Sequence, residues 1–299
     1  MQLAAVGQDT PAKSDILSAA MVRRLILAAL LAIGATTAAA VTLGSGAVTV
    51  RAARRVPALV AMRAAPRMSA SARGRDRFMI PSNADQLIVV SSPTLDPPAP
   101  GYLAGFRTYQ RGSPSAPWKQ VLGPWQAETG SGHLIAAAQR REGDHATPLG
   151  VFGIGGTMYG TEPNPGGLHY GYHQLVCGDW WDEDPYSSHY SHFVHVPCSE
   201  TPDFASWSEA LWTEGNAYPY LAVIDFNTGP IVGGADALGS GIFLHSWMGT
   251  STEGCVALPE AQLLQVLRWL RPHAHPVIEI GLDQELAALT GALRPFAAA

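Results

Sequence analysis

Residues 239–258, GSGIFLHSWMGTSTEGCVAL, decide what fold and chemistry to expect from this chain. The apolar run before His245 predicts a buried strand that ends at the histidine, and a ten-residue span then leads to Cys255. A thiol needs a base beside it to ionise near neutral pH, and a histidine at the end of an adjacent strand supplies one. Gly254 permits a tight turn whose main-chain N–H groups can face a developing oxyanion. We therefore expect Cys255 to be a nucleophile with His245 as its base.

Elsewhere, short apolar runs alternate with clusters of Gly, Pro, Asn and Asp, which is typical of a mainly β domain. We expect strands at residues 87–90, 102–109, 133–138, 150–154, 174–177, 220–226, 242–245 and 277–280. One helix is predicted at residues 259–270, because Pro259 suits a first helical turn, the leucines form one apolar stripe and Pro272 ends it. The expected fold is a β-sandwich or mixed sheet with a short helix after the nucleophile.

The N-terminal residues differ from the rest of the chain. Arg23 and Arg24 precede an apolar run at residues 25–33 and a small-residue stretch at 35–40, which is typical of a secretory signal ending near residue 40. Met21 is then a candidate start. A membrane anchor is the alternative, because the uncharged run 25–50 is long enough to span a bilayer. The arginines that follow it argue against an anchor, and either interpretation predicts export.

The remaining organisation is simple. Residues 41–80 are rich in Ala and Arg and predict a linker, residues 81–285 a catalytic domain, and residues 286–299 a tail. The linker's charge offers a way to hold the protein near the membrane or cell wall. A net charge of −5 gives no electrostatic argument for nucleic acid as a partner.

Export makes the three cysteines informative, because two of them can pair in an oxidising compartment. Cys177 and Cys198 bracket a loop-like stretch, so we expect them to form a disulfide that leaves Cys255 as a free thiol. His169, His173, His189, His192 and His195 have spacings that can bind zinc, but their surroundings favour loop positions without a metal.

The cysteine stretch resembles the active-site motif of the YkuD-type L,D-transpeptidases. The residues that carry the likeness are 243–245 (FLH) and 252–258 (TEGCVAL), together with 141–144 (REGD) and 147–152 (TPLGVF) upstream. The resemblance covers roughly residues 103–281 and implies a YkuD-like fold. Ala257 stands where most members have Arg or Asn, and the histidine-to-cysteine loop is short. In both traits the chain resembles the branch of the family whose active-site motif reads Gly-Cys-Val-Ala-Leu.

This resemblance implies a reaction without a metal or organic cofactor. The Cys255 thiolate attacks the carbonyl of residue 3 in a peptidoglycan stem tetrapeptide, D-Ala leaves, and a neighbouring stem's amine forms a 3-3 cross-link. His245 acts as base and then acid, the C=O of Ser246 orients its ring, and the N–H of Gly254 contributes to the oxyanion hole. We expect substrate contacts from the side chains of Trp247, Thr252, Trp181, Asp182 and Tyr170. For Trp181 the alternative is an anchor that holds a long loop to the core.

Other functions remain open at this level. Water as the acceptor gives an L,D-carboxypeptidase or amidase through the same acyl-enzyme. A cell-wall-binding protein could keep the fold without turnover, although such a protein has no need of His245, Gly254 and Cys255. A zinc peptidase requires the histidines to converge in space.

Overall fold

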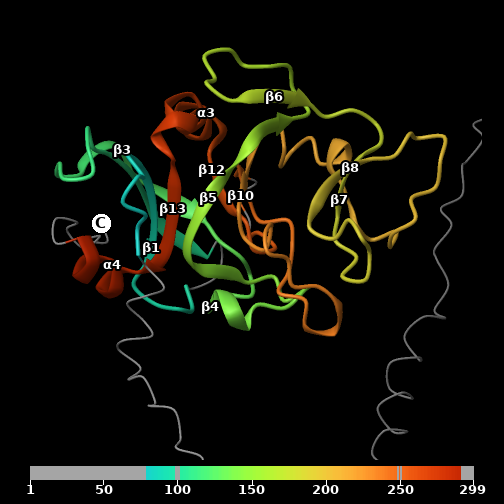
Figure 1. Cartoon of the computed structure of the whole chain (residues 1–299), viewed down its shortest axis with the longest axis horizontal. Helices are drawn as coiled ribbons and strands as arrows, with labels where there is room; N and C mark the ends of the chain where they lie inside the picture. Colours follow the sequence, from blue (N-terminus) through green and yellow to red (C-terminus); the bar gives the residue numbers. More distant parts are fainter. Residues whose placement is uncertain (1–78, 98–101, 248, 250, 291–299) are drawn as a thin grey trace, which may run out of the picture. The chain divides into compact units, whose positions relative to one another are not determined.

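Strands make up most of the ordered secondary structure in the computed structural model, which describes residues 79–97, 102–247, 249 and 251–290 (Figure 1). The strands are β1 (Gln86–Ser92), β2 (Leu103–Gln110), β3 (Lys119–Glu128), β4 (Leu134–Ala136), β5 (Thr147–Gly160), β6 (Gly171–Gln174), β7 (Asp179–Asp182), β8 (His192–His195), β9 (Glu209–Ala210), β10 (Leu221–Ile224), β11 (Phe243–Ser246), β12 (Val256–Leu258) and β13 (Val277–Leu282). The described helices are α3 (Glu260–Trp269) and α4 (Asp283–Thr290).

Ten strands form one mixed sheet in the order β10-β11-β12-β3-β2-β1-β13-β5-β4, with β6 also paired to β5. The long strand β5 pairs with β13 through residues 150–153 and with β10 through residues 154–159. This second pairing closes the main sheet on itself, so the strands from β10 round to β5 leave few unpaired edges. The pair β11–β12 is parallel, and it lies between antiparallel neighbours on both sides.

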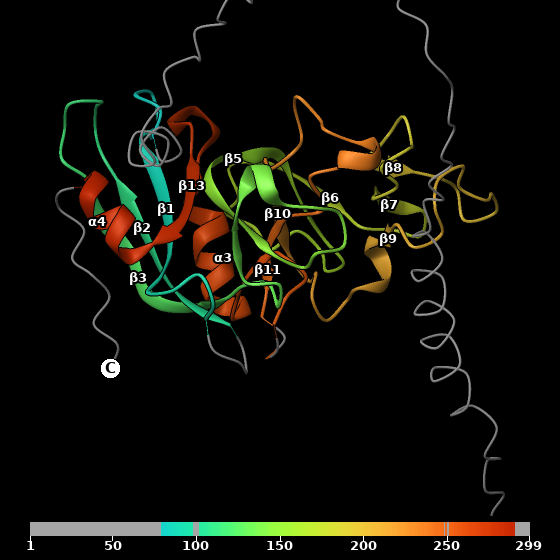
Figure 2. The same ribbon diagram turned by 90° about the horizontal axis from the view of Figure 1, so that it is seen from below.

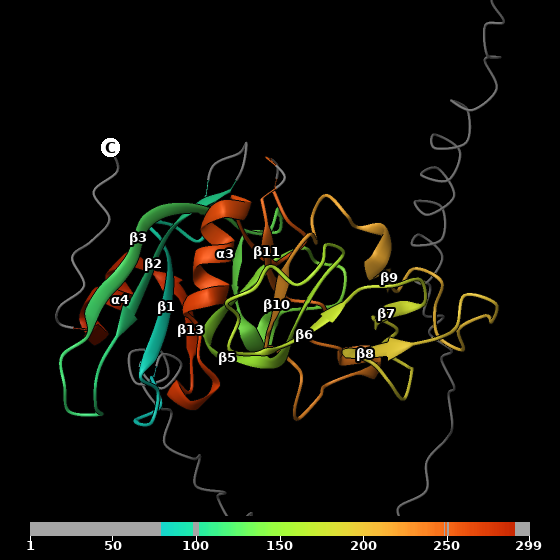
Figure 3. The same cartoon turned by 90° about the horizontal axis from the view of Figure 1, so that it is seen from above.

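Helix α3 fills the space beside β11 and β12 (Figures 2 and 3). It buries Leu263, Val266 and Leu267, which lie on one face at helical spacing and pack into the main core. The central strand β1 is buried along its whole length between β2 and β13, and its apolar residues 87–90 belong to the main core. The core therefore fixes the strand ends from which the functional residues project.

A separate three-stranded sheet has the order β8-β7-β9 and lies on the side of the molecule away from β1 and β13 (Figure 1). Its strands have only two to four residues. In its register Trp181 lies opposite Glu209, so the residue after β7, Glu183, comes close to Glu209. The importance of this sheet is that it supplies two carboxylates to the site described below.

The predicted fold class is confirmed, since the described chain is mainly β and α3 follows the cysteine as expected. The strand predicted at residues 174–177 was misplaced, because β6 ends at Gln174 and the next three residues lead into a turn. The segment between the two cysteines was predicted to be loop-like, but it contains β7 and β8. Strand β3 was not predicted because Gly123 and Pro124 interrupt it, and the β2–β3 register shifts nearby.

The expected signal or anchor at residues 1–40, and the linker up to residue 78, lie outside the described residues. Helix α4 continues across the boundary expected at residue 285 and packs against β1 and β13. No helix within the described ranges is both long enough and apolar enough to cross a membrane.

Candidate active site

His245 and Cys255 are placed by two parallel neighbouring strands. Leu244 of β11 lies opposite Val256 of β12, so His245 follows on one strand and Cys255 immediately precedes the other. Both side chains are buried, with exposed fractions of 5% for His245 and 6% for Cys255, and both line a cavity of about 900 Å³. Because sheet hydrogen bonds set their relative position, the geometry of the pair does not depend on the connecting loop.

The Cys255 thiol is held by backbone groups of the segment that enters β11. Its Sγ donates to the carbonyl oxygen of Gly241 at 3.2 Å and accepts from the Phe243 N–H at 3.3 Å. Burial raises the pKa of the Cys255 thiol, and the carboxylates of Glu209 and Glu183 raise it further. The Phe243 N–H and the Arg140 guanidinium act in the opposite direction but do not outweigh burial. The resting nucleophile is therefore a neutral thiol.

His245 is also neutral at rest. Burial lowers its pKa to about 4, against the opposing effect of hydrogen bonds with the backbone of Ser246 and Ala217. Its Nδ1 lies 3.3 Å from the carbonyl oxygen of Ala217, and the ring of Tyr218 meets the imidazole edge-on with centroids 5.3 Å apart. With Nδ1 bonded to a carbonyl, Nε2 is left as the basic nitrogen, which is the tautomer required to accept a proton.

The turn before Cys255 is organised by Thr252. Its Oγ1 donates to the carbonyl oxygen of Cys255 at 2.7 Å and accepts from the Gly254 N–H at 3.3 Å. Gly254 has φ of +125°, and a Cβ there would lie 2.8 Å from the carbonyl oxygen of Ala146. Only glycine fits this conformation and this space. Because the Gly254 N–H already has a partner, its expected part in the oxyanion hole remains a prediction.

The REGD and TPLGVF segments pack against this turn. Asp144 accepts from the N–H groups of Arg141 and Ala146, and it forms an ion pair with Arg140. The Thr147 hydroxyl accepts from the Gly130 N–H at 2.8 Å, and Gly130 bridges to Thr252. The likeness between these segments and the YkuD pattern thus corresponds to residues that build the floor beneath the cysteine turn.

The cavity is markedly acidic. Six glutamates line it, whereas Arg140 is the only Lys or Arg among the described lining residues. Burial and the repulsion of neighbouring carboxylates, Glu209 first among them, raise the pKa of Glu183 to about 9. Burial, with repulsion from Glu214 and Glu253, raises the pKa of Glu209 to about 7. Glu209 Oε1 accepts a 2.5 Å hydrogen bond from the Tyr218 hydroxyl, which partly offsets this effect. Glu209 can therefore gain or lose a proton near neutral pH, whereas Glu183 is protonated there.

Only some of the expected substrate contacts line this cavity. Thr252 does, but its hydroxyl is engaged in the turn. Trp181 is buried and packs edge-on against Phe243, which agrees with the alternative of a core anchor. Asp182 is fully buried and accepts from Ser208 and from the Asp184 N–H. The last two expected contacts, Tyr170 in the main core and Trp247 after β11, are not among the lining residues.

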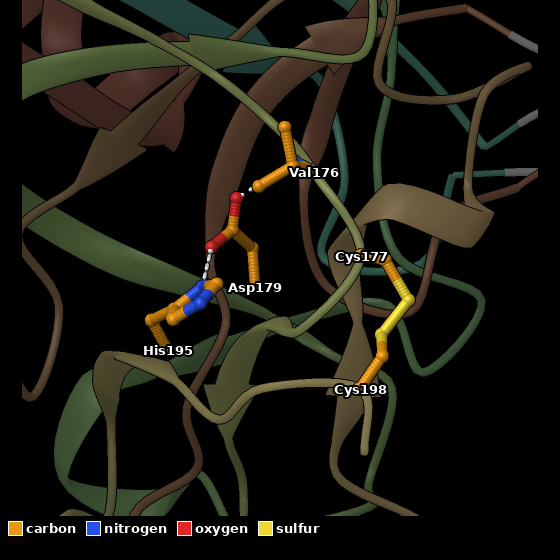
Figure 4. Close-up of a disulfide and its surroundings, with 5 residues drawn as sticks. All are labelled: Val176, Cys177, Asp179, His195 and Cys198. Atoms are coloured by element: carbon orange, nitrogen blue, oxygen red, sulfur yellow. Dashed lines mark hydrogen bonds and ion pairs between the residues drawn. A yellow bond between two sulfur atoms is a disulfide. The ribbon is translucent and has the colours of Figure 1, made fainter.

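The predicted disulfide between Cys177 and Cys198 is present, and Cys255 is the free cysteine (Figure 4). Beside it, the fully buried Asp179 accepts from His195 Nδ1 at 2.7 Å and from the Val176 N–H at 2.8 Å. His173 Nε2 lies 2.8 Å from Oδ2 of the same Asp179 carboxylate.

The Asp179 carboxylate contacts both of these histidines. They lie on strands β6 and β8, not in loops as expected. Among the described residues, no group of three or more His, Cys, Asp or Glu side chains is arranged to hold a metal.

Several cavity residues were not predicted. Ala217 and Tyr218 support His245, while Glu209 and Arg140 lie near Cys255. The first three lie in segments without periodicity or motif. Arg140 directly precedes the REGD segment, and its pairing with Asp144 at i,i+4 was the one available signal.

A buried thiol and a neutral imidazole on adjacent strands, opening into one cavity, are the groups that a cysteine acyl-transfer site requires. A family model described as the L,D-transpeptidase catalytic domain, YkuD, matches residues 102–278. The chain therefore belongs to the YkuD family. Searches of curated proteins and of solved structures found no match.

Proposed function

We propose that this chain is an exported L,D-transpeptidase that forms 3-3 cross-links in peptidoglycan through a thioester on Cys255. The observation that carries the proposal is the arrangement of Cys255 and His245 on the β11–β12 pair, both lining a cavity of about 900 Å³. A cavity of this size accommodates a peptide stem. Membership of the family supports peptidoglycan as the partner.

The proposed acylation starts from neutral partners. When the stem peptide enters, its carbonyl carbon lies over Sγ, and the thiol proton passes to Nε2 of His245 as sulfur attacks. The C–S bond forms, the tetrahedral oxyanion is stabilised by backbone N–H groups near Cys255, and the C–N bond to D-Ala breaks. His245 returns its proton to the departing amine, so both side chains end the step without net charge. An amine acceptor then reverses these transfers to release the product.

Export is supported by the Cys177–Cys198 disulfide, because such bonds persist mainly in oxidising compartments. Association of the N-terminal residues with a membrane or cell wall is part of the same proposal. The test is the reduced and non-reduced mobility of the protein recovered from cell fractions.

Incubation with disaccharide-tetrapeptide tests the reaction itself. Release of D-Ala with a mass adduct on Cys255 supports the acyl-enzyme, and accumulation of dimers rather than tripeptides supports transfer over hydrolysis. A mass adduct formed with a β-lactam independently reports whether the Cys255 thiol can be acylated. If neither reagent modified Cys255, or if Cys255→Ala retained D-Ala release, the proposal would be refuted.

A further inference from the structure

Two carboxylates lie beside Gly241, the residue that contacts the Cys255 thiol. A Cβ built on Gly241 would be 2.8 Å from Glu183 Oε1 and 3.9 Å from Glu209 Oε2. The carbonyl of the same Gly241 accepts the hydrogen bond from the Cys255 thiol. Both carboxylates line the cavity and are partly buried, and the three-stranded sheet holds them together through the Trp181–Glu209 pairing. The small sheet thus holds two acidic side chains beside Gly241, in the same cavity as Cys255.

This arrangement is unfavourable for the first half of the reaction. Both carboxylates raise the pKa of the Cys255 thiol and so oppose its ionisation. Neighbouring carboxylates face the pair in turn: Glu142, Asp182 and Glu253 raise the pKa of Glu183, and Glu214 and Glu253 raise that of Glu209, which the hydrogen bond from the Tyr218 hydroxyl lowers. A site built only to form the thiolate gains nothing from this wall. A cation that enters after acylation would gain from it directly.

The cavity wall also leaves a donor without a partner. Arg140 is only 1% exposed and lines the same cavity, yet its Nε donates no hydrogen bond within the described part of the chain. Its Nη1 is paired with Asp144, and the guanidinium lies against Gly239 and Gly254. This buried guanidinium N–H is therefore available to donate to a ligand oxygen in the cavity. A ligand that carries an ammonium group and an acceptor oxygen matches both features of this wall.

We propose that Glu183 and Glu209 form the acceptor subsite of this enzyme: they bind the ammonium group of an amine acceptor and remove the proton that it must lose before it attacks. This inference rests on the proposed function and deepens it, because it gives a reason for transfer to an amine rather than to water. The pKa of Glu209 is raised to about 7, so this carboxylate can take up such a proton under working conditions, whereas Glu183, with a pKa raised to about 9, already holds a proton at neutral pH and contributes an acceptor oxygen.

The step balances as follows. One carboxylate takes a proton from R–NH3⁺ and becomes a carboxylic acid, which leaves R–NH2. The nitrogen attacks the thioester carbon, a C–N bond forms and the C–S bond breaks. His245 takes the second nitrogen proton and passes it to the leaving sulfur, which restores the thiol.

The experiment measures how the acyl-enzyme divides between amine and water. Wild type, Glu183→Gln, Glu209→Gln and the double variant are incubated with disaccharide-tetrapeptide at pH 7, and the ratio of dimer to tripeptide is determined. This ratio is independent of the fraction of folded enzyme, because both products come from the same acyl-enzyme. Glu253→Gln is the matched control, since it removes a carboxylate from the same cavity whose side chain is 85% exposed.

We expect the double variant to lower the dimer-to-tripeptide ratio by at least about tenfold, the loss typical of an unpaired buried charge. Acylation by a β-lactam should stay as fast as in wild type or become faster, because the thiol loses two repelling neighbours. Hydroxylamine, which is neutral at pH 7, should still intercept the acyl-enzyme in the double variant.

An unchanged ratio in the double variant overturns the inference. So does an equal fall in Glu253→Gln, or a wild-type acyl-enzyme that yields only tripeptide. In each of these cases the Cys255 adduct still forms and the proposed acyl-enzyme stands. If wild type forms no adduct on Cys255, the proposed function itself fails, which separates the two failures.

Discussion

The resting protonation of Cys255 and His245 gives the sharpest test of the site. In many cysteine enzymes the two groups exist as a thiolate–imidazolium pair, which reacts quickly at acid and neutral pH. Here burial lowers the pKa of His245 from 6.5 to about 4 and raises that of the Cys255 thiol. At about 1.36 kcal/mol for each pH unit, the imidazolium costs about 3 kcal/mol more than in water. We therefore expect both groups to be neutral until substrate binds.

The assay is the rate of alkylation by iodoacetamide between pH 5 and pH 9, followed by mass spectrometry. Only Cys255 can react, because the other two cysteines form the disulfide. A neutral thiol with a raised pKa predicts a rate that climbs about tenfold with each pH unit and shows no plateau over this range. His245→Gln should leave that profile nearly unchanged.

A plateau at acid or neutral pH in wild type that disappears in His245→Gln would show a preformed ion pair and refute the reasoning. Stability offers a second check with a defined sign. Because the folded state holds His245 at a lower pKa than the unfolded chain, the unfolded chain binds more protons between about pH 6.5 and pH 4. Wild type should therefore lose up to about 3 kcal/mol across this window as pH falls, and His245→Gln should lose correspondingly less.

Three further substitutions test the surrounding structure. Gly254→Ala should destabilise the fold by about 2 kcal/mol and slow β-lactam acylation at least about tenfold, because the residue sits at φ +125° against the Ala146 carbonyl; a wild-type rate would contradict this. Glu279 is fully buried with a pKa raised to about 8, so wild type should lose about 3 to 5 kcal/mol of stability as pH rises from about 4.5 to 8. Denaturant titrations of Glu279→Gln should lack this loss, and an equal dependence of unfolding free energy on pH in both proteins would refute it. Burial raises the pKa of Asp179, but hydrogen bonds from Val176, His173 and His195 hold it below its usual value. Asp179→Asn should therefore lower the free energy of unfolding by about 2 kcal/mol above pH 4, and the difference should shrink as pH falls. An unchanged melting temperature at pH 7 would count against this.

The placement of His245 and Cys255 on neighbouring strands was predictable because the residues involved are contiguous in the sequence. His245, Gly254 and Cys255 fall within one short stretch whose apolar flanks predict strands, and β11 and β12 are those strands. The disulfide followed from counting cysteines in a chain expected to be exported. Such local signals survive folding because neighbouring strands keep them together.

The meeting of Glu183 with Glu209 was not predictable from the sequence. Glu183 and Glu209 are 26 residues apart and are joined by a sheet whose strands are too short to show a period. Arg140 belongs to a charged run that is typical of solvent-exposed loops, and only tertiary packing against Gly239 and Gly254 buries it. Of the residues chosen for substrate contact, Trp181 and Asp182 were selected by type, but their side chains support the small sheet.

The parallel pairing of β11 with β12 has a consequence for engineering and for divergence. Since the β11–β12 register sets the relative position of His245 and Cys255, the part of the connection that precedes Thr252 can change in length and composition without moving either strand. Loops exchanged at that point between relatives should alter which stems are accepted while leaving the rate of thioester formation on small β-lactams nearly constant. On this expectation, β11 and β12 hold the two reactive side chains in place while the segment that connects them varies and changes which substrates are accepted.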